Sequence, residues 1–209
     1  MRYAMIWSSV CVLTSQLIVD NAKAQVDAPD AENVFKVNII APGLSYEKRI
    51  GYRQTLVAET YLSPYFTFSY SSNFGSNFYF TLLPGVKAAY RYYYNGSRRA
   101  DKGYTTALNN MNYFSLVYIP SVTNVAISDA YFDETRKRVV HTIGIAWGFQ
   151  RNYRNRISLD LYIGPGCMIG KSTDINASGQ YYSKPGIAPT IVSTITMGLW
   201  LNKRRNDVN

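Results

Sequence analysis

After residue 19 the sequence has no long apolar run, and this absence limits how the chain can meet a membrane. A membrane-spanning helix needs about 18 or more consecutive apolar residues, and no later segment reaches that length. Backbone polar groups must be satisfied within a bilayer, so any later membrane span would have to be a closed β-barrel. The sequence also lacks the three- and four-residue apolar spacing of an amphipathic helix.

Histidine and cysteine are nearly absent. Cys11 falls in a predicted signal peptide, so Cys167 is left without an intramolecular disulfide partner. One histidine and one cysteine are too few for a transition-metal site. A hydrolytic His141 would need a nucleophile in reach, and its same-face neighbours, Val139 and Ile143, offer none. We therefore expect no catalytic residue, cofactor or metal, although a serine from an adjacent strand would revive an enzymatic role.

The first residues are typical of a secretory signal peptide. A positively charged start precedes the largely apolar residues 3–19, and Ala22-Lys23-Ala24 matches an A-x-A cleavage site. We expect residues 1–24 to be removed and the polar, aperiodic residues 25–33 to form a flexible lead. Export places the remaining chain in or beyond the cell envelope.

Residues 78–94 alternate between two faces over an unusual length. Even positions are apolar or aromatic, and odd positions are mixed and include Lys87 and Arg91. Side chains alternate along a strand, and a strand of a soluble protein usually has about five or six residues. A long alternating strand that ends in tyrosines is typical of membrane β-barrels, whose aromatic residues lie at the lipid–water boundary.

Seven further segments complete an even set of predicted strands. The eight are residues 34–40, 44–50, 53–70, 78–94, 112–124, 138–151, 156–170 and 188–201. The pattern predicts an all-β fold, namely an eight-stranded antiparallel up-and-down transmembrane β-barrel over residues 34–202. The first two strands are short and could instead be one bent strand. Prolines 64, 84, 120 and 165 lie inside predicted strands, where we expect β-bulges.

The connectors alternate in length. Residues 50–53 and 152–155 form tight turns, whereas residues 71–77, 125–137 and 171–187 are longer and polar. Short periplasmic turns and longer extracellular loops characterise outer-membrane barrels, although the long connector 95–110 falls on the short side. An even strand count puts both termini in the periplasm, including a basic tail at residues 203–209.

Charged residues gather on the predicted inward faces. The inward set comprises Lys36, Glu47, Glu59, Lys87, Arg91 and Asp160. Unpaired buried charges are costly, so these three acids and three bases should pair. Because eight strands leave a lumen just wide enough for side chains, we predict a filled interior held by an ionic network. A small polar channel is the alternative.

Most remaining basic residues are assigned to the periplasmic side of the barrel. This predicted basic rim consists of Arg53, Arg98, Arg99, Lys102, Arg151, Arg154, Arg156, Lys203, Arg204 and Arg205. Such a rim can anchor the barrel against anionic phospholipid headgroups, or it can dock an acidic periplasmic partner. The chain carries a net charge of +9, but export and this arrangement argue against nucleic acid as the partner.

Four segments resemble a known family. They are V-F-K-V-N-I-I from Val34, L-S-Y-E-K-R-I-G from Leu44, P-G-V-K-A-A-Y-R-Y-Y-Y-N from Pro84 and G-I-A-W-G-F-Q-R-N-Y-R-N-R-I-S-L-D-L-Y-I-G-P-G from Gly144. The chain resembles the small outer-membrane β-barrel proteins of Bacteroidota, most of which have no assigned activity. The resemblance implies eight strands with short first strands, Glu47 as the acid of strand two and Arg91 as the arginine of strand four.

Together these features predict a monomeric protein in the outer membrane of a Gram-negative bacterium. Its role would be structural or in surface interaction, with outer-membrane lipids as partners and without enzymatic activity. The first alternative is a soluble, lipocalin-like secreted barrel that binds a small apolar ligand, which would reverse the two faces. The second is an outer-membrane lipid-modifying enzyme or a narrow pore.

Overall fold

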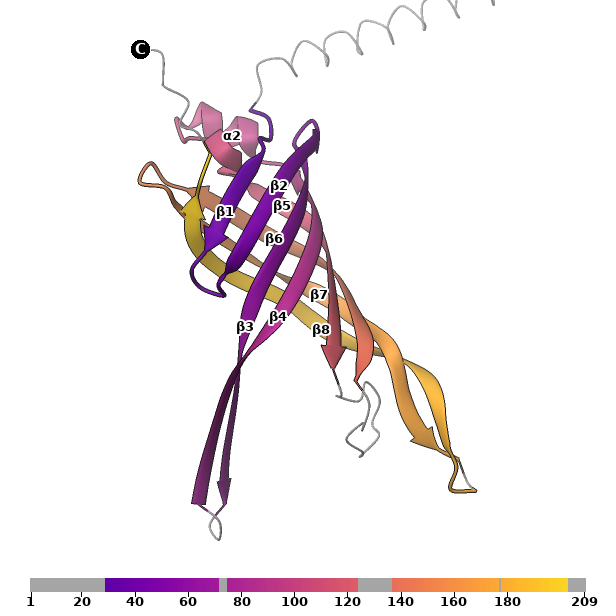
Figure 1. Ribbon diagram of the computed structural model, residues 1–209. Coiled ribbons are helices and arrows are strands. Elements are labelled where there is room, and N and C mark those ends of the chain that lie inside the picture. The colour runs from indigo at the N-terminus through magenta and orange to yellow at the C-terminus, as the bar shows by residue number, and fades with distance from the viewer. Residues whose placement is uncertain (1–28, 72–74, 124–136, 177, 203–209) are drawn as a thin grey trace, which may run out of the picture.

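The structure, a computed structural model, describes residues 29–71, 75–123, 137–176 and 178–202. Eight antiparallel strands form one closed ring of hydrogen bonding (Figure 1). They are β1 (Val34–Asn38), β2 (Gly43–Gly51), β3 (Gln54–Ser71), β4 (Gly75–Tyr93), β5 (Asn112–Thr123), β6 (Arg138–Asn152), β7 (Ile157–Ile175) and β8 (Tyr181–Trp200). Helix α2 (Gly96–Asp101) and the 3-10 helix η1 (Ala107–Asn109) lie between β4 and β5. No helix in these described segments is long and apolar enough to cross a membrane.

Every strand pairs with its sequence neighbours, and β1 pairs with β8 to close the ring. The prediction of eight antiparallel strands is therefore confirmed. The first two are separate strands and not one bent strand, although β1 has only five residues. The closing ladder is shorter still, because β1 and β8 share three residue pairs, from Lys36–Trp200 to Asn38–Gly198.

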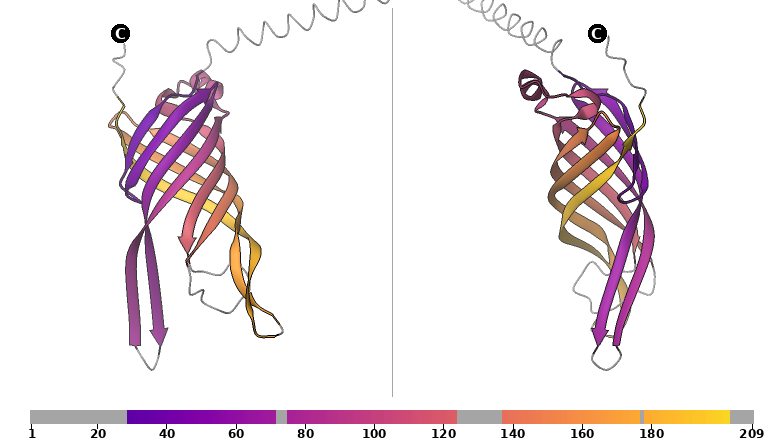
Figure 2. Two further views of the ribbon diagram at one scale, coloured as in Figure 1. Left: turned by 45° about the vertical axis from the view of Figure 1, so that its right-hand side comes forward. Right: turned by 90° about the vertical axis from the view of Figure 1, so that its left-hand side faces the viewer.

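The two ends of the ring differ (Figures 1 and 2). One end carries α2, η1, the start of β1 and the end of β8, and we call it the closed end. At the other, hairpin end, β3–β4 and β7–β8 continue as long hairpins that diverge from the ring. The difference arises because β1 is short and β4 pairs with β5 only over residues 88–93.

The structure corrects the predicted loop at residues 171–187. Strands β7 and β8 remain paired as far as Ile175 and Tyr181, so most of this segment is a hairpin. Its polar, Gly- and Ser-containing sequence gives no strand pattern, because a hairpin that is exposed on both faces does not need alternating apolar residues. The helix in the 95–110 connector was likewise not predicted, since six residues are too few for a helical stripe.

Prolines within the strands do not coincide with bulges. The β3–β4 register runs unbroken through Leu62–Pro84 and Pro64–Leu82, and the register shift recorded in this part of the sheet lies between Arg49 and Gly51. Pro64, Pro84 and Pro120 instead lie where their strands have a partner on one side only. The expectation of bulges was wrong there, because the sheet has local edges that can hold proline.

The predicted signal peptide (1–24), the basic tail (203–209) and residues 125–136 of one predicted loop lie outside the described residues. The last part of the predicted flexible lead is described and is held in place. Ala31 is buried, and Asp30 accepts a hydrogen bond from the Arg53 backbone N–H at 2.6 Å. Residues 29–33 therefore belong to the packed closed end.

Candidate functional site

The barrel interior contains all six charged residues that the alternation pattern places on inward faces. Lys36, Glu47, Glu59, Lys87, Arg91 and Asp160 are each at most 6% exposed. They come from β1, β2, β3, β4 and β7, so the closed ring brings them together from across the sheet. Their formal charges sum to zero, so each buried charge can be compensated by an opposite charge within the cluster.

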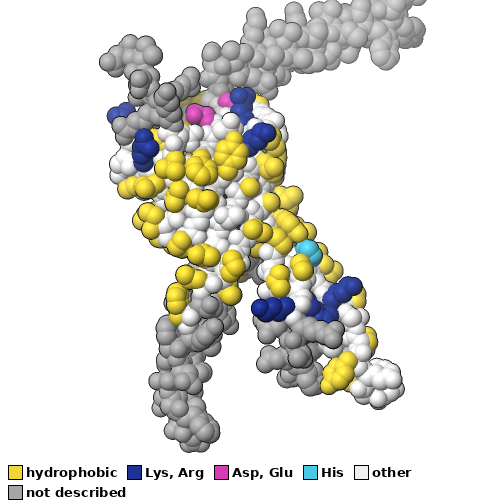
Figure 3. Space-filling model, in the orientation of Figure 1, with side chains coloured by type: hydrophobic (Ala, Val, Ile, Leu, Met, Phe, Trp, Pro, Cys, Tyr) yellow, Lys and Arg dark blue, Asp and Glu magenta, His cyan; other side chains and the backbone are white. Residues whose placement is uncertain are grey.

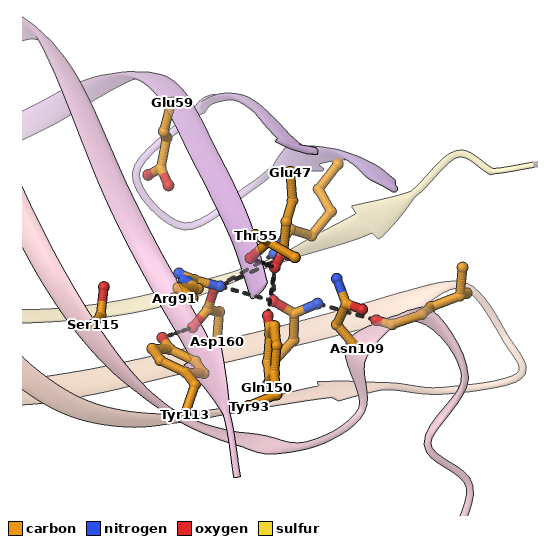
Figure 4. Close-up of polar contacts among 12 residues, drawn as sticks. Glu47, Thr55, Glu59, Arg91, Tyr93, Asn109, Tyr113, Ser115, Gln150 and Asp160 are labelled. Atoms are coloured by element: carbon orange, nitrogen blue, oxygen red, sulfur yellow. Dashed lines mark hydrogen bonds and ion pairs between the residues drawn. The ribbon is translucent and has the colours of Figure 1, made fainter. Parts of the chain in front are cut away.

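Arg91 on β4 is the hub of this cluster (Figure 4). Its Nη2 lies 2.8 Å from Oδ2 of Asp160, and its Nη1 donates to Oε1 of Gln150 at 2.9 Å. The guanidinium also lies over the Tyr113 ring, 4.2 Å from the centroid. Glu47 is a more distant ion partner at 3.9 Å.

Asp160 on β7 links two cations. Lys36 Nζ lies 3.4 Å from Asp160 Oδ2 and donates to Gln150 Oε1 at 2.9 Å. The Tyr113 hydroxyl donates to Asp160 Oδ1 at 2.5 Å. Both carboxylate oxygens therefore have partners, and Gln150 bridges the two cations through its carbonyl oxygen.

Glu47 on β2 is held chiefly by hydroxyl groups. Its Oε1 accepts hydrogen bonds from Tyr93 at 2.5 Å and Thr55 at 2.6 Å. Its Oε2 lies within ion-pair distance of Arg91, with no hydrogen bond to it among the described contacts. The two hydroxyl donors stabilise the buried Glu47 carboxylate in addition to its ion pair with Arg91.

Lys87 and Glu59 form a second layer toward the hairpin end. They are direct cross-strand partners on β4 and β3, with Lys87 Nζ 3.0 Å from Glu59 Oε2. Lys87 also lies 5.1 Å from the Tyr162 ring centroid. The side chains of both residues are at most 5% exposed, so the pair is removed from water.

By strand order alone, Glu47 and Glu59, on the two strands that precede β4, would be the acids nearest to Arg91. The structure replaces Glu59 with Asp160, because Glu59 pairs with Lys87 and β7 faces β4 across the lumen. It also adds Tyr93, Tyr113, Gln150 and Thr55, which were not named as network residues. Alternation places all four on inward faces, but only the closed ring shows which charges they contact.

A cap closes the interior at the closed end. The η1 segment lies against the cluster, and Gln150 Nε2 and Asn152 Nδ2 donate to the Leu108 carbonyl oxygen. Asn109 exchanges two hydrogen bonds with the backbone of Glu32, at 2.6 and 2.8 Å. The 95–111 connector and residues 29–33 thus seal the end of the barrel beneath Arg91.

The predicted basic rim maps largely onto this same end. Arg98, Arg99 and Lys102 lie on or beside α2, and Arg53 follows β2. Three further members, Arg151, Arg154 and Arg156, lie at or near the turn between β6 and β7. Lys203, Arg204 and Arg205 lie outside the described residues.

Several rim arginines have local protein contacts. Arg53 donates to Ser97, Arg151 donates to the Met111 carbonyl oxygen and to Asn112, and Arg156 lies over the Trp200 ring. Arg99 is half-buried and donates to Asn110, so it is not freely solvated. These arginines help to hold the closed end together as well as charging it.

Basic residues also occur at the opposite end, which the rim prediction did not include. Lys137, Arg138, Lys171 and Lys184 lie near the outer ends of β6, β7 and β8 (Figure 3). Arg138 donates to Ser183 and Thr173. The basic residues therefore occur at both ends of the barrel, with an apolar surface between them.

His141 lies on the outer surface of β6 and contacts Tyr118 of β5. The Tyr118 hydroxyl and His141 Nδ1 are 2.8 Å apart, and their rings are stacked with a 10° interplanar angle. The hydrogen-bond partner of His141 among the described residues is thus a tyrosine and not a serine. Among the described residues there is also no group of three or more His, Cys, Asp or Glu side chains placed to hold a metal ion.

The outer surface of the ring is apolar where the interior is charged. Outward positions on β3 to β8 include Leu56, Val86, Leu116, Ile145, Ile163 and Ile195, each at least 49% exposed. Toward the closed end this surface becomes aromatic, and Trp147 Nε1 donates to the Tyr94 hydroxyl at 2.7 Å. Figure 3 shows hydrophobic side chains spread over the face of the barrel wall that it presents.

Comparisons with protein-family models, curated proteins and solved structures give no match to this chain.

Proposed function

We propose that this chain is an integral outer-membrane β-barrel protein with an up-and-down barrel and a filled interior. The observation that supports it most is the inverted polarity of the sheet. Ionic pairs occupy the inside, and large apolar side chains such as Leu116 and Ile145 are exposed on the outside. Water is a poor solvent for that outer surface, whereas a bilayer suits it.

The arrangement of aromatic and basic residues supports a membrane orientation. Tyr94, Phe114 and Trp147 form an aromatic group on the outer surface near the closed end, and Tyr94 and Phe114 have centroids 5.2 Å apart. Basic residues of the rim follow directly, and such residues anchor against anionic headgroups. The closed end then faces the periplasm and the hairpins face the exterior.

The role that fits this architecture is structural or in surface interaction. The interior is crossed by direct ionic and hydrogen bonds and capped at one end, so it supports a filled barrel over a pore. A soluble, lipocalin-like barrel would need the opposite faces, and the exposed apolar wall counts against it. An acidic periplasmic partner remains the alternative occupant of the basic rim, and we expect a monomer.

Membrane integration is tested by carbonate extraction and by gel mobility. The expressed protein should stay in the membrane pellet at alkaline pH, and it should migrate differently when boiled and unboiled, as a folded barrel resists detergent at room temperature. A soluble periplasmic protein in the same cells serves as the extraction control. Release by carbonate together with a heat-independent mobility would contradict the proposal.

A further inference from the structure

The barrel wall is complete over only part of its height, and the pairing of β4 with β5 is short. These strands share six residue pairs, from Ala88–Tyr118 to Tyr93–Tyr113. At about 3.3 Å per residue and a tilt of about 35–45°, this ladder rises about 14–16 Å along the barrel axis. The apolar band of an outer-membrane barrel is about 25 Å tall, so part of the wall within it would be unpaired.

The unpaired stretch forms what we call the β4–β5 seam. Among the described residues, β4 pairs with β3 but not with β5 over residues 84–87, and β5 pairs with β6 but not with β4 over residues 119–122. If the β4–β5 register continued, Pro84 would face Val122 and Pro120 would face Val86. Both of these opposing pairs therefore contain a proline.

The two proline nitrogens point into the seam. Tyr94 N–H donates to the Asn112 carbonyl oxygen across the β4–β5 ladder, and backbone direction alternates along an antiparallel strand. Even-numbered residues of both strands therefore direct their N–H groups toward each other, and residues 84 and 120 are even. Because proline has no N–H, two ladder bonds that would close the seam cannot form.

The same rule holds at the gap beyond the short β1–β2 hairpin. Ile39 N–H donates to the Met197 carbonyl oxygen, so odd residues of β8 point toward β1, and these include Pro185 and Pro189. Leu62 N–H donates to the Pro42 carbonyl oxygen, so even residues of β3, including Pro64, point toward β2. Proline thus recurs where a free edge would expose an unpaired donor.

We propose that the β4–β5 seam is a lateral opening through which an acyl chain of a surrounding membrane lipid reaches the barrel interior. The proposal rests on the membrane insertion proposed above. Leu83, next to Pro84, shares the face of β4 that carries Lys87 and Arg91, yet it is 49% exposed, whereas Val122 lies on the outward face of β5 and is 67% exposed. Apolar side chains at a seam that cannot complete its backbone ladder suit an acyl chain and not an added peptide strand.

Neighbouring residues on opposite faces allow a direct test. Cys11 and Cys167 are replaced by serine, and a thiol-reactive fluorophore is attached at Leu83→Cys, Leu82→Cys or Leu116→Cys in the full chain. Each labelled protein is inserted into phosphatidylcholine vesicles whose acyl chains carry bromine, a short-range quencher. Leu82 and Leu116 are outward, and Leu83 is on the inward face. We expect quenching at Leu83→Cys to be similar to that at Leu82→Cys.

The other outcomes separate the two proposals. Quenching at Leu82→Cys without quenching at Leu83→Cys would show a wall closed to lipid and would overturn the lateral opening. Quenching at Leu116→Cys alone would place the seam outside the hydrocarbon and would also overturn it. Loss of quenching at all three sites would contradict membrane insertion itself, and the opening would fall with it.

The role of the prolines has a separate readout. In the protein labelled at residue 83, the double change Pro84→Thr and Pro120→Thr restores both missing donors and should lower quenching as β4 and β5 pair. Pro165→Thr, on β7 and away from the seam, is the matched control and should leave quenching unchanged. Unaltered quenching in the double variant would show that the prolines do not hold the seam open.

Discussion

At the residue scale, Arg91 connects opposite walls of the barrel. Its guanidinium joins Asp160 of β7, Gln150 of β6 and, at longer range, Glu47 of β2. A planar guanidinium suits this position because its several donors diverge toward different partners. The arginine therefore contributes both charge balance and a cross-lumen link.

Arg91→Met should destabilise the barrel strongly. Removing this one cation leaves an excess of buried negative charge, which typically costs about 3–5 kcal/mol. The matched control is Arg98→Met, because Arg98 is exposed on α2, and it should change stability by about 0.5 kcal/mol or less. Urea unfolding from lipid vesicles measures both, and equal effects would place Arg91 in water.

A second-site change identifies the partner of Arg91. Adding Glu47→Gln to Arg91→Met should recover part of the lost stability, because Lys36 still neutralises Asp160 and Glu47 is the carboxylate left without a cation. Adding Glu59→Gln instead should lower stability further, since Lys87 would lose its own carboxylate. Equal recovery from both would contradict the assignment of Glu59 to Lys87.

The Lys87–Glu59 pair should behave as an independent unit. Lys87→Met alone leaves the buried Glu59 carboxylate without a cation and should lower the free energy of unfolding by about 3–5 kcal/mol. The double variant Lys87→Met with Glu59→Gln should have a free energy of unfolding much closer to that of the wild type. A double-mutant cycle in urea unfolding measures the coupling. Additive losses from the two single changes would mean that the pair is solvated.

At the element scale, closure of the barrel depends on a short contact between β1 and β8. Gly198 allows this contact, because a Cβ there would lie 2.1 Å from the Val37 carbonyl oxygen. Its strand partner in this ladder is Asn38. The backbone of β1 cannot retreat without opening the ring, so the close approach requires glycine at this position.

Gly198→Ala should therefore weaken ring closure. We expect a loss of about 3 kcal/mol, at the upper end of the range for overpacking, seen as a lower urea midpoint and a smaller heat-dependent gel shift. Gly51→Ala is the control, because its nearest contact would be the flexible Gln54 side chain at an ordinary 3.4 Å. An unchanged midpoint for Gly198→Ala would show that β1 can move aside.

At the scale of the whole molecule, the interior is obstructed in successive layers. The Lys87–Glu59 pair, the Arg91 cluster and the cap from residues 95–111 follow one another toward the closed end. The Lys87–Glu59 pair joins neighbouring strands, the Arg91 cluster joins opposite walls of the ring, and the cap is hydrogen-bonded to β6. An ion entering from the hairpin end would have to break all of them.

We expect no stable ion conductance when the protein is inserted into a planar lipid bilayer. An eight-stranded lumen is barely wide enough for side chains, and here it holds large residues such as Arg91, Tyr93 and Tyr113, each at most 1% exposed. A porin of known conductance serves as the positive control. Steady single-channel steps on the nanosiemens scale would contradict the filled interior.

Much of the fold could be predicted because alternation is a local property of the chain. The pattern around Lys87 and Arg91 indicates which residues face inward, and the structure places them there. The β7–β8 hairpin and helix α2 were missed, since neither has an apolar face long enough to be read from the sequence. Segment 29–33 was also missed, because it is held by hydrogen bonds to residues that are distant in the sequence.

The sequence by itself determined the number of strands, the faces of the segments that it predicted and the charge-neutral set of inward residues, because side-chain alternation follows from backbone geometry alone. Only the tertiary structure decided that Arg91 meets Asp160 and that Glu59 meets Lys87, because partners across a lumen depend on ring closure and strand register. It also decided where pairing stops between β4 and β5. The end of the β4–β5 pairing explains how the prolines are accommodated, since proline removes a hydrogen bond inside a ladder but none at a free edge.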